Sequence, residues 1–97
     1  MKKLNAQEVN KLYDAILSIK DRKECEDFLR DLLTKTELNE VAARWLVARL
    51  LNKGTTYVEI EKITGLSSTT VARVHKWLKK SKGGYVAMLN KRRNKYV

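Results

Sequence analysis

Apolar residues recur every three or four positions through the first third of the chain, with polar residues between them. One such stripe follows Asn5 and a second follows Asp21, and each of these residues has a glutamate three positions later. A small polar residue followed by glutamate at this spacing is a capping box, which marks a helix start. The pattern predicts two amphipathic helices, each with one face that needs a partner. Their apolar positions are Val9, Leu12, Tyr13, Ile16 and Ile19 in the first, and Cys25, Phe28, Leu29, Leu32 and Leu33 in the second.

A third helix start is indicated by Thr34 with Glu37, and Gly54 is suited to end that helix. Its second half, WLVARLL at residues 45–51, is apolar apart from Arg49. A helix that is apolar on most sides is buried on most sides. In so short a chain, this predicts a central helix or a helix shared with a second subunit.

The stretch YVEIEKITGLSSTTVARVHKW, residues 57–77, has the pattern of a helix-turn-helix. Thr56 can cap a short first helix, and Ser67 can cap a second helix that runs to about Lys80. Gly65 lies in the turn between them, where the backbone needs a positive φ angle. The apolar residues expected where the two helices touch are Ile60, Leu66, Val71 and Val74.

A break at residues 81–84 precedes a short helix from Tyr85 to about Lys91 and a basic tail. No segment shows the alternation of a strand. We therefore expect an all-α fold of about six helices, with a helix-turn-helix in the C-terminal half, in a single domain of residues 1–97. Within it, we expect core and dimerisation helices at 5–54, the helix-turn-helix at 56–80, and the short helix with the basic tail at 84–97.

The two halves of the chain differ in net charge. Residues 1–51 hold ten Lys or Arg against nine Asp or Glu, whereas residues 52–97 hold eleven Lys or Arg against two acids, Glu59 and Glu61. The net charge of the whole chain is +10. A basic half joined to a near-neutral half is typical of a polyanion-binding protein. A basic surface that only maintains solubility is the alternative.

The second helix of the motif carries side chains that suit a major groove. Its first turns hold small hydrogen-bonding groups that can approach base edges, and its end, from His75 to Lys80, holds groups that suit phosphates. We expect Thr69, Thr70 and Lys76 to contact bases or adjoining phosphates. Nonspecific attraction is expected from Lys79, Lys80 and the tail residues Lys91, Arg92 and Arg93. The predicted DNA-binding residues are Thr56, Ser67, Ser68, Thr69, Thr70, Arg73, Lys76, Lys79 and Lys80.

The segment LTKTELNEVAARWLVARLLNKGTTYVEIEKITGLSSTTVARV, residues 33–74, resembles the tryptophan repressor superfamily. Over about residues 5–90 the chain is similar to the YerC/YecD-type branch of that superfamily, of which the sequence GGY at 83–85 is typical. The resemblance implies an intertwined homodimer of six-helix subunits. It also implies that their recognition helices enter successive major grooves of a palindromic operator.

The same resemblance implies an effector pocket between the third helix and the recognition helix. Thr34, Arg44 and Arg73 match the threonine and the two arginines that hold tryptophan in the repressor. Val74 and Trp77 replace smaller residues, and their bulk disfavours L-tryptophan as an effector. If Trp77 occupies the pocket, Arg73 would stack on its indole and DNA binding would be constitutive. The alternative is that Trp77 packs in the core and a different small ligand binds the arginines. The candidate effector residues are Thr34, Arg44, Arg73 and Trp77.

The sequence contains no arrangement of residues typical of an enzyme active site or of a metal site. His75 and Cys25 are the only residues of their types, and they lie on different predicted helices. Neither has a visible partner for nucleophilic chemistry, and no metal-ligand spacing occurs. No signal peptide and no apolar run of roughly 20 residues are present. We therefore expect a cytoplasmic, soluble, non-enzymatic protein without a metal or cofactor.

The sequence favours a sequence-specific DNA-binding transcriptional regulator, a repressor, that acts on double-stranded DNA as a helix-turn-helix homodimer. The alternative is an adaptor module that uses the helix-turn-helix to bind nucleic acid or protein without operator specificity. The hydroxyl and basic side chains on the second helix favour DNA over a protein partner, because a protein-binding helix would expose a broad apolar patch there.

Overall fold

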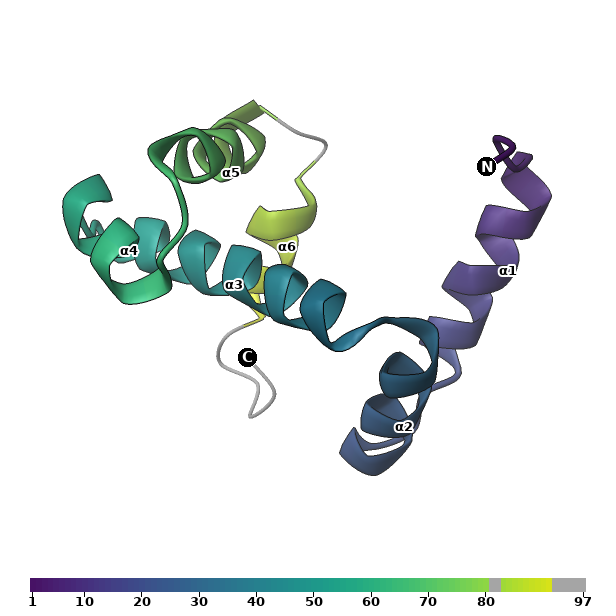
Figure 1. The fold of residues 1–97 in the computed structure, drawn as a ribbon. Coiled ribbons are helices and arrows are strands. Elements are labelled where there is room, and N and C mark those ends of the chain that lie inside the picture. The colour runs from purple at the N-terminus through teal and green to yellow at the C-terminus, as the bar shows by residue number, and fades with distance from the viewer. Residues whose placement is uncertain (81–82, 92–97) are drawn as a thin grey trace. The chain divides into compact units, whose positions relative to one another are not determined.

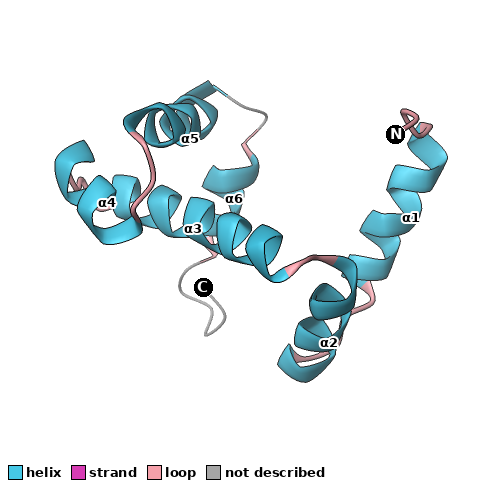
Figure 2. Ribbon diagram, viewed as in Figure 1, coloured by secondary structure: helices cyan, strands magenta, loops and turns pink. Residues whose placement is uncertain are grey.

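The computed structural model describes residues 1–80 and 83–91 as a series of helices (Figure 1). No strand occurs in these residues (Figure 2), which confirms the predicted all-α class and the number of helices. Residues 1–38 form one compact unit, and the residues from Asn39 onward form a second. No described helix is long and apolar enough to cross a membrane. The helices are α1 (Ala6–Leu17), α2 (Arg22–Leu32), α3 (Lys35–Asn52), α4 (Tyr57–Thr64), α5 (Ser68–Lys80) and α6 (Gly84–Asn90).

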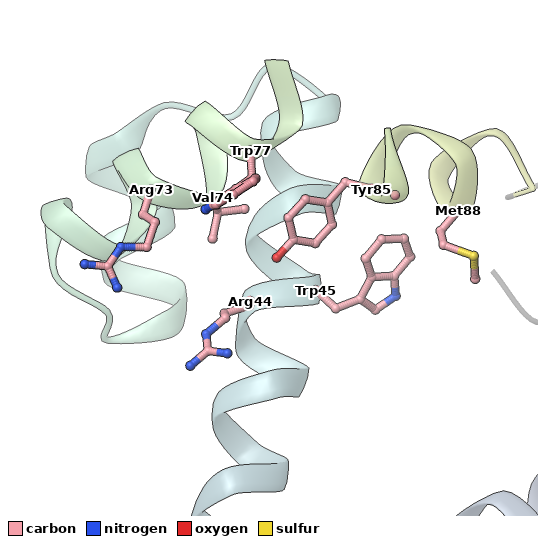
Figure 3. A pocket seen from close by; sticks show the side chains of 8 residues that line it. Arg44, Trp45, Arg73, Val74, Trp77, Tyr85 and Met88 are labelled. Atoms are coloured by element: carbon pink, nitrogen blue, oxygen red, sulfur yellow. The ribbon is translucent and has the colours of Figure 1, made fainter. Parts of the chain in front are cut away.

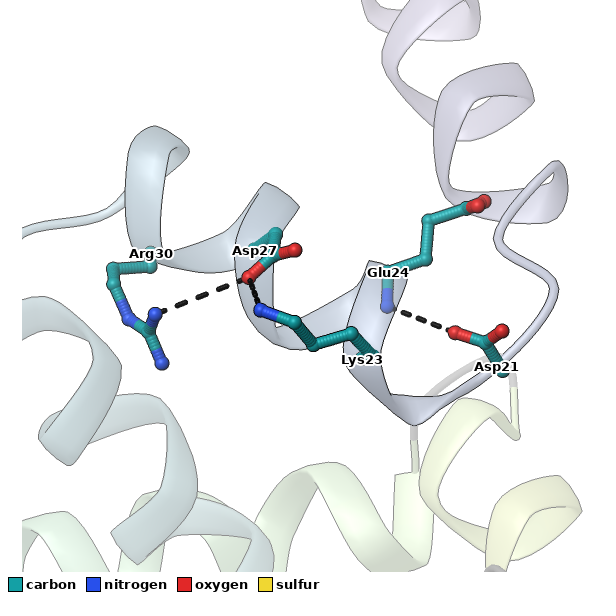
Figure 4. A network of polar contacts seen from close by, with 5 residues as sticks. All are labelled: Asp21, Lys23, Glu24, Asp27 and Arg30. Atoms are coloured by element: carbon teal, nitrogen blue, oxygen red, sulfur yellow. Dashed lines mark hydrogen bonds and ion pairs between the residues drawn. The ribbon is translucent and has the colours of Figure 1, made fainter.

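The caps predicted for α1 and α2 are both present. The Asn5 side chain accepts a hydrogen bond from the backbone N–H of Glu8 at 3.1 Å. The Asp21 carboxylate accepts one from the N–H of Glu24 at 2.9 Å (Figure 4). These bonds satisfy backbone donors that a helix start leaves without partners, so local sequence alone fixes where α1 and α2 begin.

Charged residues line the outer surface of α2. Asp27 lies 2.8 Å from the Lys23 ammonium and 3.9 Å from the Arg30 guanidinium (Figure 4). These ion pairs are exposed to solvent, so they contribute little to stability. Their effect is to keep this side of the helix in water.

The apolar faces of the first unit are only partly covered within it. Neither α1 nor α2 has a buried residue. Val9, Leu12, Tyr13 and Ile16 form an apolar stripe along α1, and we call these four residues the α1 stripe. Their exposed fractions lie between 37% and 56%. An amphipathic helix with its apolar face in water is a surface that another partner must cover.

A complete capping box begins α3. The hydroxyl of Thr34 accepts from the N–H of Glu37 at 3.0 Å, and the N–H of Thr34 donates to the Glu37 carboxylate at 2.9 Å. The bond to the Glu37 carboxylate favours its charged form. The backbone N–H of Thr34 and then its hydroxyl hold the pKa of Glu37 below its ordinary value of 4.5.

The end of α3 is fixed by Gly54, as predicted. Gly54 has a φ of 85°, in the left-handed region that favours glycine. Its N–H donates to the carbonyl of Leu51 at 3.0 Å, and the next N–H, of Thr55, donates to Leu50 at 3.0 Å. This pair of bonds is a Schellman motif, which ends the helix and turns the chain toward α4.

The core of the second unit is built by α3, α4 and α5. Of the four predicted helix-turn-helix contact residues, Ile60, Val71 and Val74 are buried, and Leu66 packs against them. The spacing of these residues therefore predicted the motif's interior. The remaining buried residues of this core are Val47 and Ala48 of α3.

Helix α3 is less buried than its apolar sequence predicts. Val47 and Ala48 are its only buried residues, and Val41 is 48% exposed. An apolar surface is thus left open along this helix. The alternative interpretation of the α3 sequence, that this helix is shared with a second subunit, stays a prediction.

The short helix α6 begins and ends one residue before the predicted bounds. Leu89 is buried, and Tyr85 packs against the core of the second unit. Lys91 directly follows the helix. The predicted tail residues Arg92 and Arg93 lie outside the described residues.

Candidate nucleic-acid interface and adjoining pocket

The turn between α4 and α5 is closed by hydrogen bonds at Gly65. This glycine has a φ of 71°, and its N–H donates to the carbonyl of Glu61 at 2.8 Å. The hydroxyl of Thr64 donates to the carbonyl of Ile60 at 2.8 Å and accepts from the N–H of Leu66 at 3.2 Å. The left-handed conformation predicted for Gly65 is confirmed, and it lets α5 leave α4 after a short turn.

Two of the predicted DNA-binding residues cap helices, and a third, Thr70, bonds to one of these caps. Thr56 accepts from the N–H of Glu59 at 3.3 Å and begins α4. Ser67 accepts from the N–H of Thr70 at 3.3 Å, and the hydroxyls of these two residues lie 3.2 Å apart. Thr70 is half-buried. Both helix starts therefore combine a hydroxyl cap with backbone N–H groups, which is a suitable arrangement for a phosphate.

The exposed side of α5 carries the remaining predicted residues. Thr69, Arg73, Lys76 and Lys80 are exposed and follow one another at spacings of four, three and four residues, so they share one helix face. We call these four residues the α5 outer face. Ser68 and Lys79 are also exposed and lie beside it. Helix α5 contains no acidic residue, so the face is a stripe of positive charge that begins with a hydroxyl.

His75 is less exposed than the lysines at the end of α5, and its expected role beside phosphates stays a prediction. Its Nδ1 lies 2.6 Å from the hydroxyl of Tyr57, and the rings meet edge to face with 5.7 Å between centroids. Both residues are half-buried. His75 stands four residues after the buried Val71, and this spacing turns it toward α4. The pair joins the two helices of the motif.

A pocket of about 740 Å³ lies beside α5 in the second unit. Side chains from α3, α5 and α6 form its walls (Figure 3). Three of the four candidate effector residues meet there. Thr34 belongs to the first unit, where it caps α3. The lining residues are Arg44, Trp45, Arg73, Val74, Trp77, Gly84, Tyr85 and Met88.

Aromatic rings make up much of the pocket wall. Trp45 and Tyr85 stack with 6.4 Å between centroids and 11° between ring planes. The Arg49 guanidinium lies 5.9 Å from the centroid of the Trp45 ring. The Tyr85 ring projects into the pocket (Figure 3). Sequence reasoning gave no pocket role to Trp45 or to Tyr85, because only the fold brings α6 against α3.

Trp77 lines the pocket without filling it. Its side chain is 55% exposed, so it is not a core residue. The Arg73 side chain extends away from Trp77 (Figure 3). Among the described residues, the cation–ring contact is that of Arg49 with Trp45, and the expected stacking of the Arg73 guanidinium on the Trp77 indole does not occur. The pocket is therefore open to a ligand. No group of three His, Cys, Asp or Glu in the described part of the chain is placed to hold a metal ion.

The sequence pattern of the family described as Trp repressor protein matches residues 7–93, which is nearly the whole chain. The chain belongs to the Trp repressor protein family. This family consists of helix-turn-helix DNA-binding regulators, in agreement with the α4–Gly65–α5 geometry.

Similar proteins cover almost the same length. The chain is 40% identical to the uncharacterized protein YerC of Bacillus subtilis over 89 residues, which are 92% of this chain and 86% of that protein. The crystal structure of a TrpR-like protein from Eubacterium eligens superposes with a TM-score of 0.87 at 35% identity, covering 92% of both chains. A second solved structure, from Staphylococcus aureus, gives a TM-score of 0.86 at 32% identity, covering 92% of this chain and 89% of that one. The six-helix Trp repressor fold is thus shared along the chain.

Proposed function

We propose that this protein is a sequence-specific DNA-binding transcriptional repressor that acts as a homodimer on a palindromic operator. The observation that carries the proposal is the α5 outer face. It is exposed along one side of the helix while Val71 and Val74 on the other side are buried. A hydroxyl and a row of cations on one accessible helix face provide both base-reading and phosphate-binding groups. Membership of the Trp repressor family supports the same function.

Within this proposal, the residues of the motif divide by chemistry. Thr69 and Arg73 lie in the first turns of α5 and read base edges, for which the Arg73 guanidinium has the fork that pairs with guanine. Lys76 contacts a base or an adjoining phosphate. The positive charges at the end of α5 neutralise phosphates. The starts of α4 and α5 present backbone N–H groups to phosphates. The phosphate-contacting residues are Lys79, Lys80, Thr56, Ser67, Ser68 and Thr70.

The open apolar surfaces support dimerisation. The α1 stripe and Val41 of α3 are exposed, and a chain of 97 residues buries only a modest core. A second copy that covers these surfaces would remove them from water. Two recognition helices related by a twofold axis then read half-sites about 34 Å apart, one turn of the double helix.

Selection of bound sequences from random duplex DNA tests this function. We expect an inverted repeat with half-site centres about one helical turn apart. Replacing Lys76, Lys79 and Lys80 together with glutamine should weaken binding of every sequence and reduce the salt dependence by about three units of slope. Salt-dependent binding without an enriched sequence would instead favour the adaptor alternative.

A separate measurement distinguishes repression of transcription from activation. A promoter that overlaps the selected operator should give less transcript when the protein is added to purified RNA polymerase. The lysine variant, which has the same fold but lacks three phosphate contacts, should not reduce it. An increase in transcript would show an activator.

We also propose that Arg44, Arg73 and Trp77 hold a small effector in the pocket beside α5. The three residues come from α3 and α5 and line one open pocket. The effector role that the family resemblance gives to Thr34 stays a prediction, because the contacts of its side chain are those of the α3 cap.

A further inference from the structure

Helix α4 has an exposed side that carries none of the residues proposed to contact DNA. Four side chains lie there at spacings of three and four residues, so they share one helix face, and the buried Ile60 lies on the other side. This face is also separate from the surfaces that support dimerisation, which are the α1 stripe and Val41. We call its four residues the α4 outer face, and they are Val58, Glu59, Lys62 and Ile63.

The two ends of the α4 outer face are apolar. Val58 is 63% exposed and Ile63 is 58% exposed. A single exposed apolar residue is ordinary on a protein surface. Two β-branched side chains on one face of an eight-residue helix form a patch whose burial against a partner is favourable.

The two residues between them carry opposite charges and have no ionic partner. Within the described part of the chain, neither Glu59 nor Lys62 is in an ion pair. Glu59 is one of two acidic residues after residue 51, in a half of the chain with eleven Lys or Arg. An acid in the first turn of a helix and a base in its last turn suit the helix dipole, so this order is stable in the single chain. Both charges remain available to a partner.

The order of the four residues makes the α4 outer face complementary to itself. Along the helix the face runs apolar, acidic, basic, apolar. Against an antiparallel copy, Glu59 meets the second copy's Lys62, and Val58 meets its Ile63. A twofold axis at the middle of the helix makes each of these contacts twice, which is an isologous interface. A parallel copy would place like charges opposite each other, so the charges specify the antiparallel orientation.

The small size of the face limits the strength of this contact. Four side chains on each copy bury far less than the roughly 800 Å² per partner of a stable protein–protein interface. Exposed ion pairs add little to it. The contact therefore needs a second link that holds the two copies close together and raises their effective concentration. Two dimers bound at adjacent sites on one DNA duplex meet this condition.

We infer that the α4 outer faces of neighbouring DNA-bound dimers pair in the antiparallel orientation, so that dimers bind adjacent operators cooperatively. The occupant of the face is thus a second copy of this chain. This inference rests on the proposed DNA-binding function. The pairing couples the two sites, and each bound dimer raises the affinity of the other site by the same factor.

Duplexes that carry one or two copies of the selected operator test the cooperativity. The spacing between the two copies is varied over one helical turn, so that the faces are presented at every relative angle. We expect a range of spacings at which the second dimer binds on the order of tenfold more tightly than a dimer binds the single operator. Footprinting titrations measure this ratio of affinities. The ratio removes the effect that a variant has on DNA binding itself.

A charge swap tests the self-complementary pairing. Glu59→Lys opposes two lysines in each ion pair of the contact, and Lys62→Glu opposes two glutamates, so each should abolish the cooperativity. The variant with both changes has the native net charge and complementary pairs, and it should regain the cooperativity. Glu61→Lys is the matched control, because it makes the same change in charge on α4 at a half-buried position outside the face. It should keep the native ratio.

Sedimentation without DNA separates this inference from the proposed function. Linked sites have effective concentrations in the millimolar range, so a tenfold effect corresponds to a dissociation constant of roughly 0.1 mM. At roughly millimolar concentration, the native protein should therefore associate beyond the size that it has in dilute solution. Glu59→Lys should not, and the doubly changed variant should.

Several results would overturn the inference. The same affinity ratio in Glu59→Lys as in the native protein, or no cooperativity of the native protein at any spacing, would show that the face does not join neighbouring dimers. No gain in the doubly changed variant would exclude the antiparallel pairing. Loss of cooperativity in Glu61→Lys would assign the effect to overall charge. If the protein binds no DNA, the proposed function fails, whereas sedimentation still decides whether the faces pair.

Discussion

The hydroxyl of Tyr57 and Nδ1 of His75 lie 2.6 Å apart and join the first residue of α4 to the middle of α5. The rings are inclined at 71° and meet edge to face. Since the outer face of α5 is the surface proposed to read DNA, this contact helps to fix the angle at which that surface is presented. Gly65 sets the turn between the helices, and the Tyr57–His75 pair holds them together farther along α5.

Replacing Tyr57 with phenylalanine should cost about 1 kcal/mol of stability, because it removes the hydrogen bond and keeps the ring. Urea unfolding at one fixed protein concentration measures this, since the stability of a dimer depends on concentration. A double-mutant cycle with His75→Gln isolates the contribution of the pair. A coupling energy near zero would mean that the two side chains meet without stabilising the motif.

The parts of the fold that the sequence predicted correctly depend on residues close together in the chain. Each cap joins residues three apart, as at Asn5 with Glu8 and Thr34 with Glu37. The interior of the helix-turn-helix follows from the short spacing between Ile60 and Val74, which a fixed turn converts into contacts. Backbone geometry allows few alternatives over such distances, so the pattern of residue types was sufficient.

The features that were missed join distant residues. Tyr57 and His75 are 18 residues apart, and Trp45 and Tyr85 stack between α3 and α6. Which of these side chains meet depends on how the helices cross, and residue types do not specify this. For a related reason, the sequence left open whether the surface around Val41 is covered by its own chain or by a second subunit. An apolar pattern indicates that a surface needs a partner, but it does not say whether the partner is the same chain.

The capping box of α3 should make stability sensitive to acid. The backbone N–H and then the hydroxyl of Thr34 lower the pKa of Glu37 from 4.5. A carboxyl group with a lower pKa in the folded state stabilises the fold above its unfolded pKa, and this contribution is lost as the pH falls through the folded pKa. We therefore expect urea midpoints between about pH 6 and about pH 3 to fall less steeply in Glu37→Gln than in the native protein. Glu40→Gln, on the same helix but outside the cap, is the comparison. The same acid dependence in Glu37→Gln and in the native protein would contradict this role.

The role of Thr34 can be separated from that of the pocket residues. Thr34→Ala should lower stability by about 1 kcal/mol, the usual effect of losing a helix cap, and Thr34→Ser should retain most of it because serine also caps. Neither change should alter the affinity for anilinonaphthalene sulfonate, a fluorescent aromatic anion that suits the aromatic rings and arginines of the pocket. Weaker probe binding in Thr34→Ala would instead support the effector role implied by the family resemblance.

A charge placed in the α1 stripe should prevent dimerisation. Ile16 is 44% exposed in the single chain, and burying an unpaired carboxylate there on association would be strongly unfavourable. We expect Ile16→Asp to give a monomeric mass by light scattering at concentrations where the native protein is a dimer. Gln7→Asp introduces the same charge on the opposite side of α1 and should remain dimeric. A native protein of monomeric mass, or a dimeric Ile16→Asp, would refute the proposed interface.

The two threonines at the start of α5 should differ in what they do. Thr69 is exposed on the outer face, whereas Thr70 is half-buried with its hydroxyl 3.2 Å from that of Ser67. Replacement by valine removes the hydroxyl and keeps the shape in both cases. Thr69→Val should change the preference at one or two base pairs by about 1–3 kcal/mol. Thr70→Val should change base preference less and lower the stability of the free protein more, because its hydroxyl belongs to the network that begins the helix. Selection of bound sequences and urea unfolding on the same two variants measure both effects. If Thr70→Val gives the larger change in base preference, then the hydroxyl of Thr70 turns from Ser67 toward the DNA in the complex, and the division of roles along α5 is wrong.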